Sequence, residues 1–372
     1  MKIKQLKYLF LTGACLLACL ACSKDDDSKI DMTADAKLTV TIKAAGVKTK
    51  AYNPDDKNEL QGEANINNLA VIVFSADGSE VYGSKWEPVK TEYTATLTDV
   101  PAKANNARIV IVANIPESVV NSITSYDGFQ SALVGLESQS QTSLAMSSRV
   151  IDTDKPLAKD DNYLGYTSMG DKNVNGISSP IYLTRVASRI DLISVDTKFA
   201  GTKLNGNSVR VEQVSVINRK TQAHYFSEAE WGMVEVDGNL DNSPAASLNS
   251  IINDANSLTE TSYVSYVMEN SDTTAPTSIQ IRASLMNASG NVAQTKTFSS
   301  PINLNGVNLG YGHNLIKRNY VYRVWVTFGE NSFDPEDPED PENPEDPENP
   351  TSLIVRVVVV DWGPVYQDVV ID

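Results

Sequence analysis

The segment KLTVTIKA at residues 37–44 carries the clearest strand pattern of this chain. Leu38, Val40 and Ile42 are apolar, and the residues that alternate with them are threonines and lysines. Successive side chains of a β-strand point to opposite faces, so a period of two predicts a strand with one apolar face. We expect that face to pack into the core of a β-domain.

Similar short segments, rich in β-branched residues and separated by Gly, Asn, Asp and Pro, recur downstream. This pattern fits β-sandwiches better than alternating strands and helices. In one segment the alternation slips at Glu212 and Gln213, which predicts a bulge. The expected strands are residues 37–44, 69–74, 93–97, 108–113, 181–183, 190–195, 209–217, 263–268, 279–286, 295–298 and 320–328.

The length of the chain favours two domains, because about 350 residues are too many for one ordinary core. The strand pattern starts again after Pro180, and only residues 117–136 have some helical character. We therefore predict an all-β fold, with one sandwich at residues 37–185 and a second at residues 186–333.

The N-terminus predicts export and a lipid anchor. Residues 2–7 hold three lysines, and residues 8–20 are apolar but too short for an ordinary membrane span. The junction before Cys22 resembles the lipobox of bacterial lipoproteins, which implies removal of residues 1–21 and acylation of Cys22. Several acyl chains, at about 0.8 kcal/mol per buried methylene, anchor a chain stably. A plain secretory signal is the alternative.

Residues 22–36 form an acidic spacer whose SKDDD sequence is similar to the surface-export tag on lipoproteins of the Bacteroidales. The cysteines of the chain, Cys15, Cys19 and Cys22, all lie at or before the lipobox junction. The mature chain thus has no thiol pair to oxidise, and we expect its core alone to stabilise it.

An acidic linker at residues 334–350 (DPEDPEDPENPEDPENP) precedes a final apolar segment. Its nine acidic residues supply more than half of the net charge of −16, which argues against nucleic acid as a partner. Proline favours extended structure and like charges repel, so we expect the linker to hold residues 351–372 away from the body. The linker lacks the glycine and ligand alternation of a calcium loop.

An apolar segment that is tethered by an extended linker is typical of a strand donated to another subunit. The alternative is that it completes the second domain of its own chain. A partial version also stays open, in which residues 353–362 pair within their own chain, Gly363 and Pro364 break the strand, and the remaining residues are donated. The candidate donor residues are Val357, Val359, Val365, Val369 and Ile371.

With these pieces in order, the chain resembles the fimbrillins, the type V pilus subunits of the Bacteroidales. The resemblance implies transthyretin-like sandwiches, a lipid-anchored outer-membrane precursor, and assembly into cell-surface fimbriae that support adhesion. It covers nearly the whole length and is carried by residues 37–56 (KLTVTIKAAGVKTKAYNPDD), 66–74 (INNLAVIVF), 317–326 (KRNYVYRVWV) and 357–368 (VVVVDWGPVYQD).

The resemblance also implies that a trypsin-like protease removes the first strand and that the empty groove accepts a strand from the next subunit. Here the removable strand carries Leu38, Val40 and Ile42, and the cut falls between Lys50 and Ala51. The family usually has Arg before the cut, so this chain implies a lysine-accepting protease. Uncovering the three apolar side chains costs about 5 to 9 kcal/mol together. The donor and the groove lie on different parts of the subunit, so the contact propagates as a filament.

Arg185 and Arg189 are further potential cleavage sites, but they lie between or within expected strands, where a protease has poor access. Catalysis finds little support, because the body of the chain after Cys22 has just two histidines, His224 and His313, no cysteine and no common catalytic motif. We expect no cofactor and no metal.

The tryptophans suggest a different class of function, a monomeric glycan-binding lipoprotein of the surface. Trp86 and Trp231 could form a glycan platform, whereas Trp325 and Trp362 lie in expected strands and are predicted to be core.

The preferred interpretation is a non-enzymatic stalk subunit of a pilus. Its partners would be other copies of itself, related pilus subunits, the processing protease and, before processing, the outer membrane. A basal anchor subunit would keep its first strand and its lipid. A tip subunit would normally lack a donor at its C-terminus.

Overall fold

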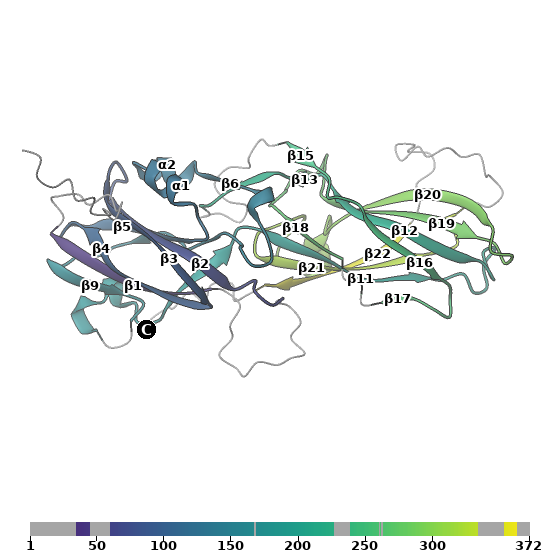
Figure 1. Ribbon diagram of the computed structural model, residues 1–372, viewed down its shortest axis with the longest axis horizontal. Coiled ribbons are helices and arrows are strands. Elements are labelled where there is room, and N and C mark those ends of the chain that lie inside the picture. Colours follow the sequence, from purple (N-terminus) through teal and green to yellow (C-terminus); the bar gives the residue numbers. More distant parts are fainter. Residues whose placement is uncertain are drawn as a thin grey trace, which may run out of the picture.

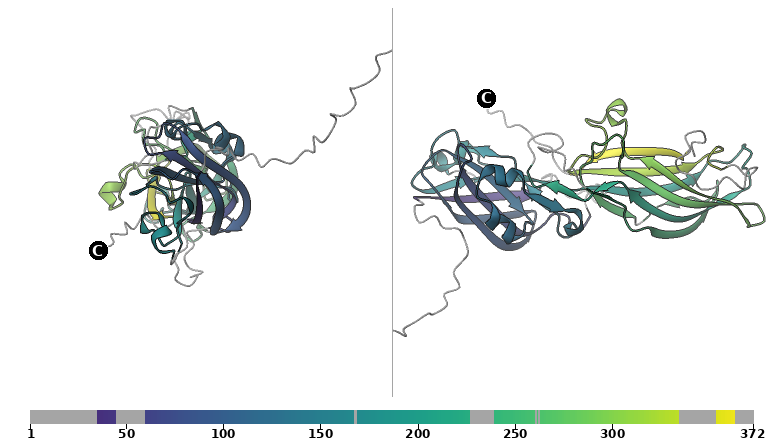
Figure 2. Two further views of the ribbon diagram at one scale, coloured as in Figure 1. Left: turned by 90° about the vertical axis from the view of Figure 1, so that its left-hand side faces the viewer. Right: turned by 90° about the horizontal axis from the view of Figure 1, so that it is seen from above.

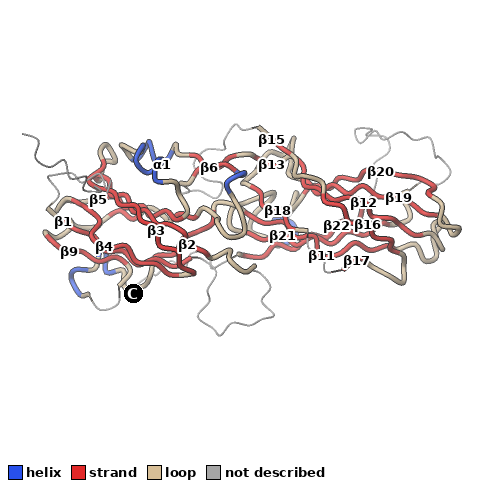
Figure 3. The backbone as a smooth tube through the Cα atoms, in the orientation of Figure 1, coloured by secondary structure: helices blue, strands red, loops and turns tan. Residues whose placement is uncertain are grey.

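The computed structural model describes residues 35–44, 60–166, 169–226, 239–259, 261, 263–333 and 353–362. In these residues the chain is nearly all β, as predicted, and its strands form two bodies that lie end to end (Figures 1 and 3). The α-helices found there are α1 (Glu117–Ser122) and α2 (Tyr126–Gln130), both within the stretch expected to have helical character. No helix among the described residues is long and apolar enough to cross a membrane.

The first body is a nine-stranded sheet with the order β3-β2-β5-β7-β10-β1-β4, to which β8 and β9 add at β5 and β1. The two ends of this order approach each other, because a Cβ on Gly83 of β3 would lie 2.1 Å from the carbonyl oxygen of Pro101 in β4. The sheet therefore curls around its own core. Its strands are β1 (Ala36–Ala44), β2 (Asn65–Ser75), β3 (Val81–Glu92), β4 (Thr94–Ala102), β5 (Ala107–Ala113), β7 (Met146–Ser147), β8 (Ile151–Asp152), β9 (Asp160–Leu164) and β10 (Ile181–Arg185).

The second body contains a five-stranded sheet, β17-β11-β21-β22 with β18 beside β11, and a four-stranded sheet, β16-β12-β19-β20. Their apolar faces share one hydrophobic cluster. The bulge expected at Glu212 is confirmed, since the register of β12 shifts between Val211 and Gln213. The strands are β11 (Ser188–Thr197), β12 (Ser208–Ile217), β16 (Ala246–Ile252), β17 (Leu258–Thr259), β18 (Val264–Val267), β19 (Ser278–Met286), β20 (Val292–Pro301), β21 (Tyr320–Phe328) and β22 (Leu353–Asp361).

The two bodies are joined by a third hydrophobic cluster and by backbone pairing. Phe129 of the first body packs edge-on against Phe226 of the second, with ring centroids 5.9 Å apart. Strand β6 pairs with β14, so one short sheet spans the junction (Figure 2). The remaining elements are β6 (Leu133–Gly135), β13 (Arg219–Lys220), β14 (Gln222–His224), β15 (Leu240–Asp241) and the 3₁₀ turns η1 (Leu136–Ser138), η2 (Gly170–Lys172), η3 (Val174–Gly176) and η4 (Gly306–Leu309).

The tryptophans divide between core and surface. Trp362 is buried, as predicted, but Trp325 is only partly buried, so its assignment to the core is wrong. Its side chain lies on the outer face of β21, where the guanidinium of Arg356 sits 4.1 Å from the ring centroid. Trp86 is partly buried, and its indole N–H donates to the carbonyl oxygen of Ile115 at 2.9 Å. Trp231 lies outside the described residues.

Candidate functional site: the groove of the first strand

Strand β1 is a central strand of the first body, with partners on both sides. It runs antiparallel to β4, where Val40 faces Leu97, and parallel to β9 and β10, where Val40 faces Leu164 and Ile42 faces Ile181. A central strand has backbone hydrogen bonds along both edges. Its loss would therefore leave two unpaired strand edges at once.

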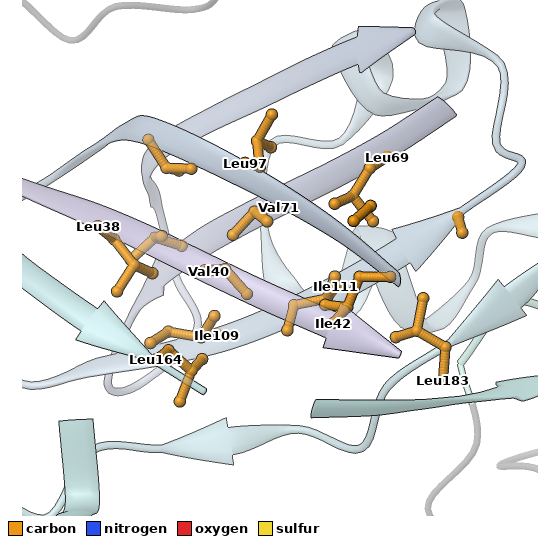
Figure 4. Close-up of a cluster of buried hydrophobic side chains, with 14 of the residues drawn as sticks. Leu38, Val40, Ile42, Leu69, Val71, Leu97, Ile109, Ile111, Leu164 and Leu183 are labelled. Carbon is orange, nitrogen blue, oxygen red and sulfur yellow. The ribbon is translucent and has the colours of Figure 1, made fainter. Parts of the chain in front are cut away.

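The inward face of β1 is completely buried in the first core (Figure 4). The three side chains predicted from the sequence, Leu38, Val40 and Ile42, are 0% exposed. Ala36 and Ala44 continue the same face at both ends, and neither was predicted. The spacing of two could have identified them, but alanine gives a weak apolar signal. The groove thus has five inward positions, small at the ends and large in the middle.

The outward face of β1 adds little stability. Lys37 pairs with Asp99 at 3.4 Å, but both side chains are more than half exposed. Exposed ion pairs contribute at most about 1 kcal/mol. The strand is therefore held mainly by its buried face and its backbone.

Two groove residues that the sequence did not reveal contact the backbone of β1. Asn162 of β9 is buried and donates from Nδ2 to the carbonyl oxygen of Lys37 at 3.2 Å. Gly165, which has a φ of +84°, lies so close that a Cβ there would be 2.5 Å from the carbonyl oxygen of Thr41. Both contacts recognise main chain rather than side chain, so any strand in the groove can make them.

The predicted lipidation and cleavage residues, Cys22, Lys50 and Ala51, lie outside the described residues. The alternative cleavage sites do not, and Arg185 and Arg189 are both fully buried. The prediction that they are poorly accessible to a protease is confirmed.

The C-terminal strand pairs within its own chain. Strand β22 runs antiparallel to β21 from Phe328 opposite Leu353 to Tyr320 opposite Asp361. The expectation that the linker keeps residues 351–372 away from the body is wrong for β22, and the partial alternative, pairing at home up to Trp362, describes this structure.

The expectation failed because the charge of the linker does not determine where the strand that follows it packs. Closing a flexible loop costs free energy that grows only slowly with loop length. Leu353, Val355 and Val357 gain burial against the second core, which opposes that cost. Of the predicted donor residues, Val357 and Val359 are paired in the strand register with Val324 and Tyr322 of the same chain. The other three, Val365, Val369 and Ile371, lie outside the described residues.

Trp362, directly after β22, ends in a buried polar cluster at the junction of the two bodies. Its indole N–H donates to Oε2 of Glu63 at 2.9 Å. The same carboxylate accepts from Nη1 of Arg189 at 2.6 Å and from the hydroxyl of Tyr266 at 2.7 Å. The backbone N–H of Leu60 adds a further bond at 2.7 Å.

The ring of Trp362 is enclosed by the same group of residues. The guanidinium groups of Arg185 and Arg189 lie 4.9 and 5.3 Å from its centroid, and the ring of Tyr266 is stacked on it at 6.0 Å. Cations over an indole ring are attracted by its quadrupole, the more so when desolvated. We call Glu63, Arg185, Arg189, Tyr266 and Trp362 the Glu63 cage.

The cage balances its buried charges. Glu63 and Arg189 both have fully buried side chains, and Asp191 accepts two further bonds from Arg189 at 2.7 and 2.8 Å. Although burial alone lowers the pKa of Arg189, the bonds and charges of Asp191 and Glu63 raise it overall. Burial, and then the negative charge of Glu63, raise the pKa of Tyr266. The guanidinium of Arg189 therefore stays charged, and the phenol of Tyr266 stays protonated and can donate to Glu63 beside the indole N–H of Trp362.

His313 is buried, and its Nε2 lies 2.8 Å from the hydroxyl of Tyr322. Among the residues that the structure describes, no group of three or more His, Cys, Asp or Glu could hold a metal ion.

Two family models together match this chain from the first strand to Trp362. The model "Major fimbrial subunit protein (FimA)" matches residues 36–185, and "Fimbrium tip subunit Fim1C-like, C-terminal domain" matches residues 186–362. A relative from Parabacteroides distasonis with the name "Putative fimbrium tip subunit Fim1C" is 50% identical over the full length of both chains. The chain therefore belongs to the FimA and Fim1C-like fimbrial subunits.

Solved structures agree with this assignment. A crystal structure of a "putative cell adhesion protein" from Parabacteroides distasonis has 49% sequence identity and a TM-score of 0.79, covering 90% of this chain and 99% of the other. A fimbrilin (FimA) from Porphyromonas gingivalis has the same fold, with a TM-score of 0.59 at 18% identity and coverage of 90% and 99%. The predicted resemblance to fimbrillins is confirmed.

Proposed function

We propose that this fimbrial subunit occupies the tip of a cell-surface fimbria. It is exported with a lipid on Cys22, loses β1 by cleavage after Lys50, and accepts the strand of a neighbouring subunit in the groove of β1. Its own β22 stays in the second body. The observation that carries the tip role is the Glu63 cage, which holds the end of β22 at the junction.

The proposal that the subunit accepts a strand from its neighbour rests on the geometry of β1. The strand fills a groove between β4 on one side and β9 and β10 on the other, and its inward residues are buried. Emptying the groove exposes apolar surface and two strand edges, and an incoming strand restores both. Asn162 and Gly165 favour this exchange because they contact main chain only.

The proposal that the subunit does not donate β22 rests on the contacts that removal of this strand would disrupt. The edge of β21 would lose a partner along nine residues, and Trp362 would leave a closed pocket. Glu63 would keep a buried charge with one donor fewer, and a buried polar group left without its partner costs about 1 to 3 kcal/mol. A tip subunit does not have to release β22, because no further subunit lies beyond it to receive a donated strand.

The comparisons support the tip role. The full-length relative and the family model of the second half both carry the words fimbrium tip subunit in their names. The proposed division of the chain into domains at residues 185 and 186 is supported by the two family models, which meet there.

The stalk role predicted from the sequence is the second candidate. Ten residues follow Trp362, and Val365, Val369 and Ile371 among them are apolar. A stalk subunit could donate this tail alone and leave β22 and the Glu63 cage in place.

Deleting residues 363–372 distinguishes the two roles. A tip subunit without this tail still joins fimbriae of normal length, detected by immunogold labelling at one end. If the deletion instead shortens or abolishes the fimbriae, the chain is a stalk subunit and the tip proposal is wrong.

Cleavage is tested on chain recovered from fimbriae by N-terminal sequencing, which should read from Ala51. Lys50→Ala should block processing and incorporation, whereas Lys48→Ala, two residues earlier, should have no effect. Mature chain that still begins at an acylated Cys22 would contradict strand removal.

A further inference from the structure

A cleft of about 580 Å³ is lined by η1 of the first body and by residues of β13, β15, β16 and β18 of the second. Figure 1 shows β6, β13, β15 and β18 where the two bodies meet. One wall follows η1 of the first body, and the other belongs to the second body. We call it the junction cleft and define it by Glu137, Gln139, Arg219, Asp241, Tyr263 and Ser265. Its volume is within the range of ordinary small-ligand sites, about 300 to 1,000 Å³.

The walls of the junction cleft are fixed by backbone contacts. The N–H of Leu136 donates to the carbonyl oxygen of Thr221 at 2.7 Å, directly beside the β6–β14 pairing. On the opposite wall, Ser243 and Val216 exchange two hydrogen bonds of 2.7 and 2.8 Å. A site formed in advance does not need to be ordered by its ligand, which favours binding.

The charges of the cleft disfavour an anionic ligand. Arg219 donates from Nε and Nη2 to the two carboxylate oxygens of Asp241, both at 2.9 Å, so its fork is occupied. The Asp241 side chain is still 40% exposed, and Glu137 is exposed as well. An anion would meet two carboxylates and an already paired cation. The same carboxylates are good acceptors for hydroxyl groups.

Uncharged polar groups complete the lining. The hydroxyl of Ser265, a residue only 6% exposed, hydrogen-bonds to the phenol of Tyr263, and this bond lowers the pKa of that phenol against the larger, raising effect of burial. Gln139 accepts from the N–H of Ala145 at 2.9 Å and donates one amide proton to Ser138 at 3.0 Å, which leaves a second proton for a ligand.

We propose that the junction cleft binds a neutral oligosaccharide. A ligand rich in hydroxyls and free of charge can donate to Asp241 and Glu137 and accept from Gln139. The proposal is independent of strand exchange, because the cleft is formed by one chain and contains none of the residues of the β1 groove. Tyr266 belongs both to the lining of the cleft and to the Glu63 cage, but none of the residues altered in the test does.

The test is a glycan array probed with the purified, unprocessed full chain, followed by titration of the strongest ligands. The array carries neutral oligosaccharides of hexose, fucose and N-acetylhexosamine, together with sialylated and sulfated ones. We expect binding to a subset of the neutral glycans. Asp241→Asn should lower the affinity at least tenfold.

Two further variants separate binding from folding. Asp152→Asn is the matched control, since Asp152 also pairs with an arginine, Arg108, at 2.7 Å but lies away from the cleft, and it should bind as well as wild type. Glu137→Gln should weaken binding severalfold without lowering the melting temperature, because Glu137 lines the cleft and is exposed. The proposal is overturned by an array without neutral ligands, by binding restricted to acidic glycans, or by equal affinities of the two aspartate variants.

Discussion

Strands β1 and β22 have the same length and similar apolar patterns, but they are held in different ways. β1 is paired on both sides and its inward residues are completely buried. β22 pairs with β21, and Leu353, Val355 and Val357 are only half-buried. Its end, however, is held by Trp362 in the Glu63 cage.

This difference shows why, in the proposed exchange, β1 is the strand that leaves and β22 the strand that stays. Burial of apolar side chains is not directional, so another strand with a suitable pattern can replace β1. The cage depends on an indole N–H, the guanidinium of Arg189 and a phenol at fixed positions around one carboxylate, with Arg185 over the indole ring. A replacement strand would need a tryptophan at the same register, so β22 is the less exchangeable of the two.

The largest effect should come from Trp362→Ala. It removes a buried aromatic side chain and a donor to Glu63, so we expect the free energy of unfolding to fall by about 3 to 5 kcal/mol. Amide exchange in β21 and β22 should accelerate. Trp325→Ala, on the partly exposed face of β21, is the control and should cost about 1 kcal/mol. Equal losses for both tryptophans would remove the distinction between the strands.

Glu63→Gln should come next, with a loss of about 3 kcal/mol, because it leaves Arg189 with one anionic partner fewer inside the protein. Glu80→Gln serves as control, since Glu80 pairs with Lys103 at 3.0 Å on the surface and its loss should cost at most about 1 kcal/mol. Urea denaturation measures both. A small effect at Glu63 would mean that Asp191 alone balances Arg189.

Truncating one valine in each strand compares their burial directly. Val40→Ala should lower the stability by about 2 kcal/mol, because it removes two methyl groups from a closed core. Val357→Ala should cost about 1 kcal/mol or less, because that side chain is half-buried. The comparison fails if the order of the two values is reversed in denaturant unfolding.

The smallest effect concerns pH at the junction to which β22 is fixed. Burial lowers the pKa of His224, and the charge of Arg318 acts in the same direction, against the opposing charge of Glu269 and a bond to Gln130. The unfolded chain then binds the proton more readily, so stability should fall as the pH drops below about 6.5. His224→Asn should flatten this part of the profile of melting temperature against pH. An unchanged profile would assign the loss to other groups.

The periodicity of the sequence predicted those structural features that depend only on residues close together in the chain. The period of two located β1 and its three large inward side chains, and the slip at Glu212 located the bulge in β12. Both are properties of one strand. Ala36 and Ala44 have the correct spacing, but alanine is found in every environment and gave no signal.

Contacts between segments that are far apart in the chain produce no comparable pattern in the sequence. The bond from Trp362 to Glu63 joins residues 299 positions apart, and nothing near either residue indicates the other. The docking of β22 was predicted wrongly for a related reason. The acidic linker is conspicuous in the sequence, whereas the open edge of β21 that receives β22 is visible only in three dimensions. The junction cleft likewise exists only once both bodies are in place.

The span of that single bond also constrains the order of folding. A ribosome makes Glu63 long before Trp362, so the first body can form its core while most of the second is still unmade. One of the contacts that join the two bodies therefore forms only after Trp362 has been made. A product that is cut off before Trp362 would lack this contact even if its first body were intact.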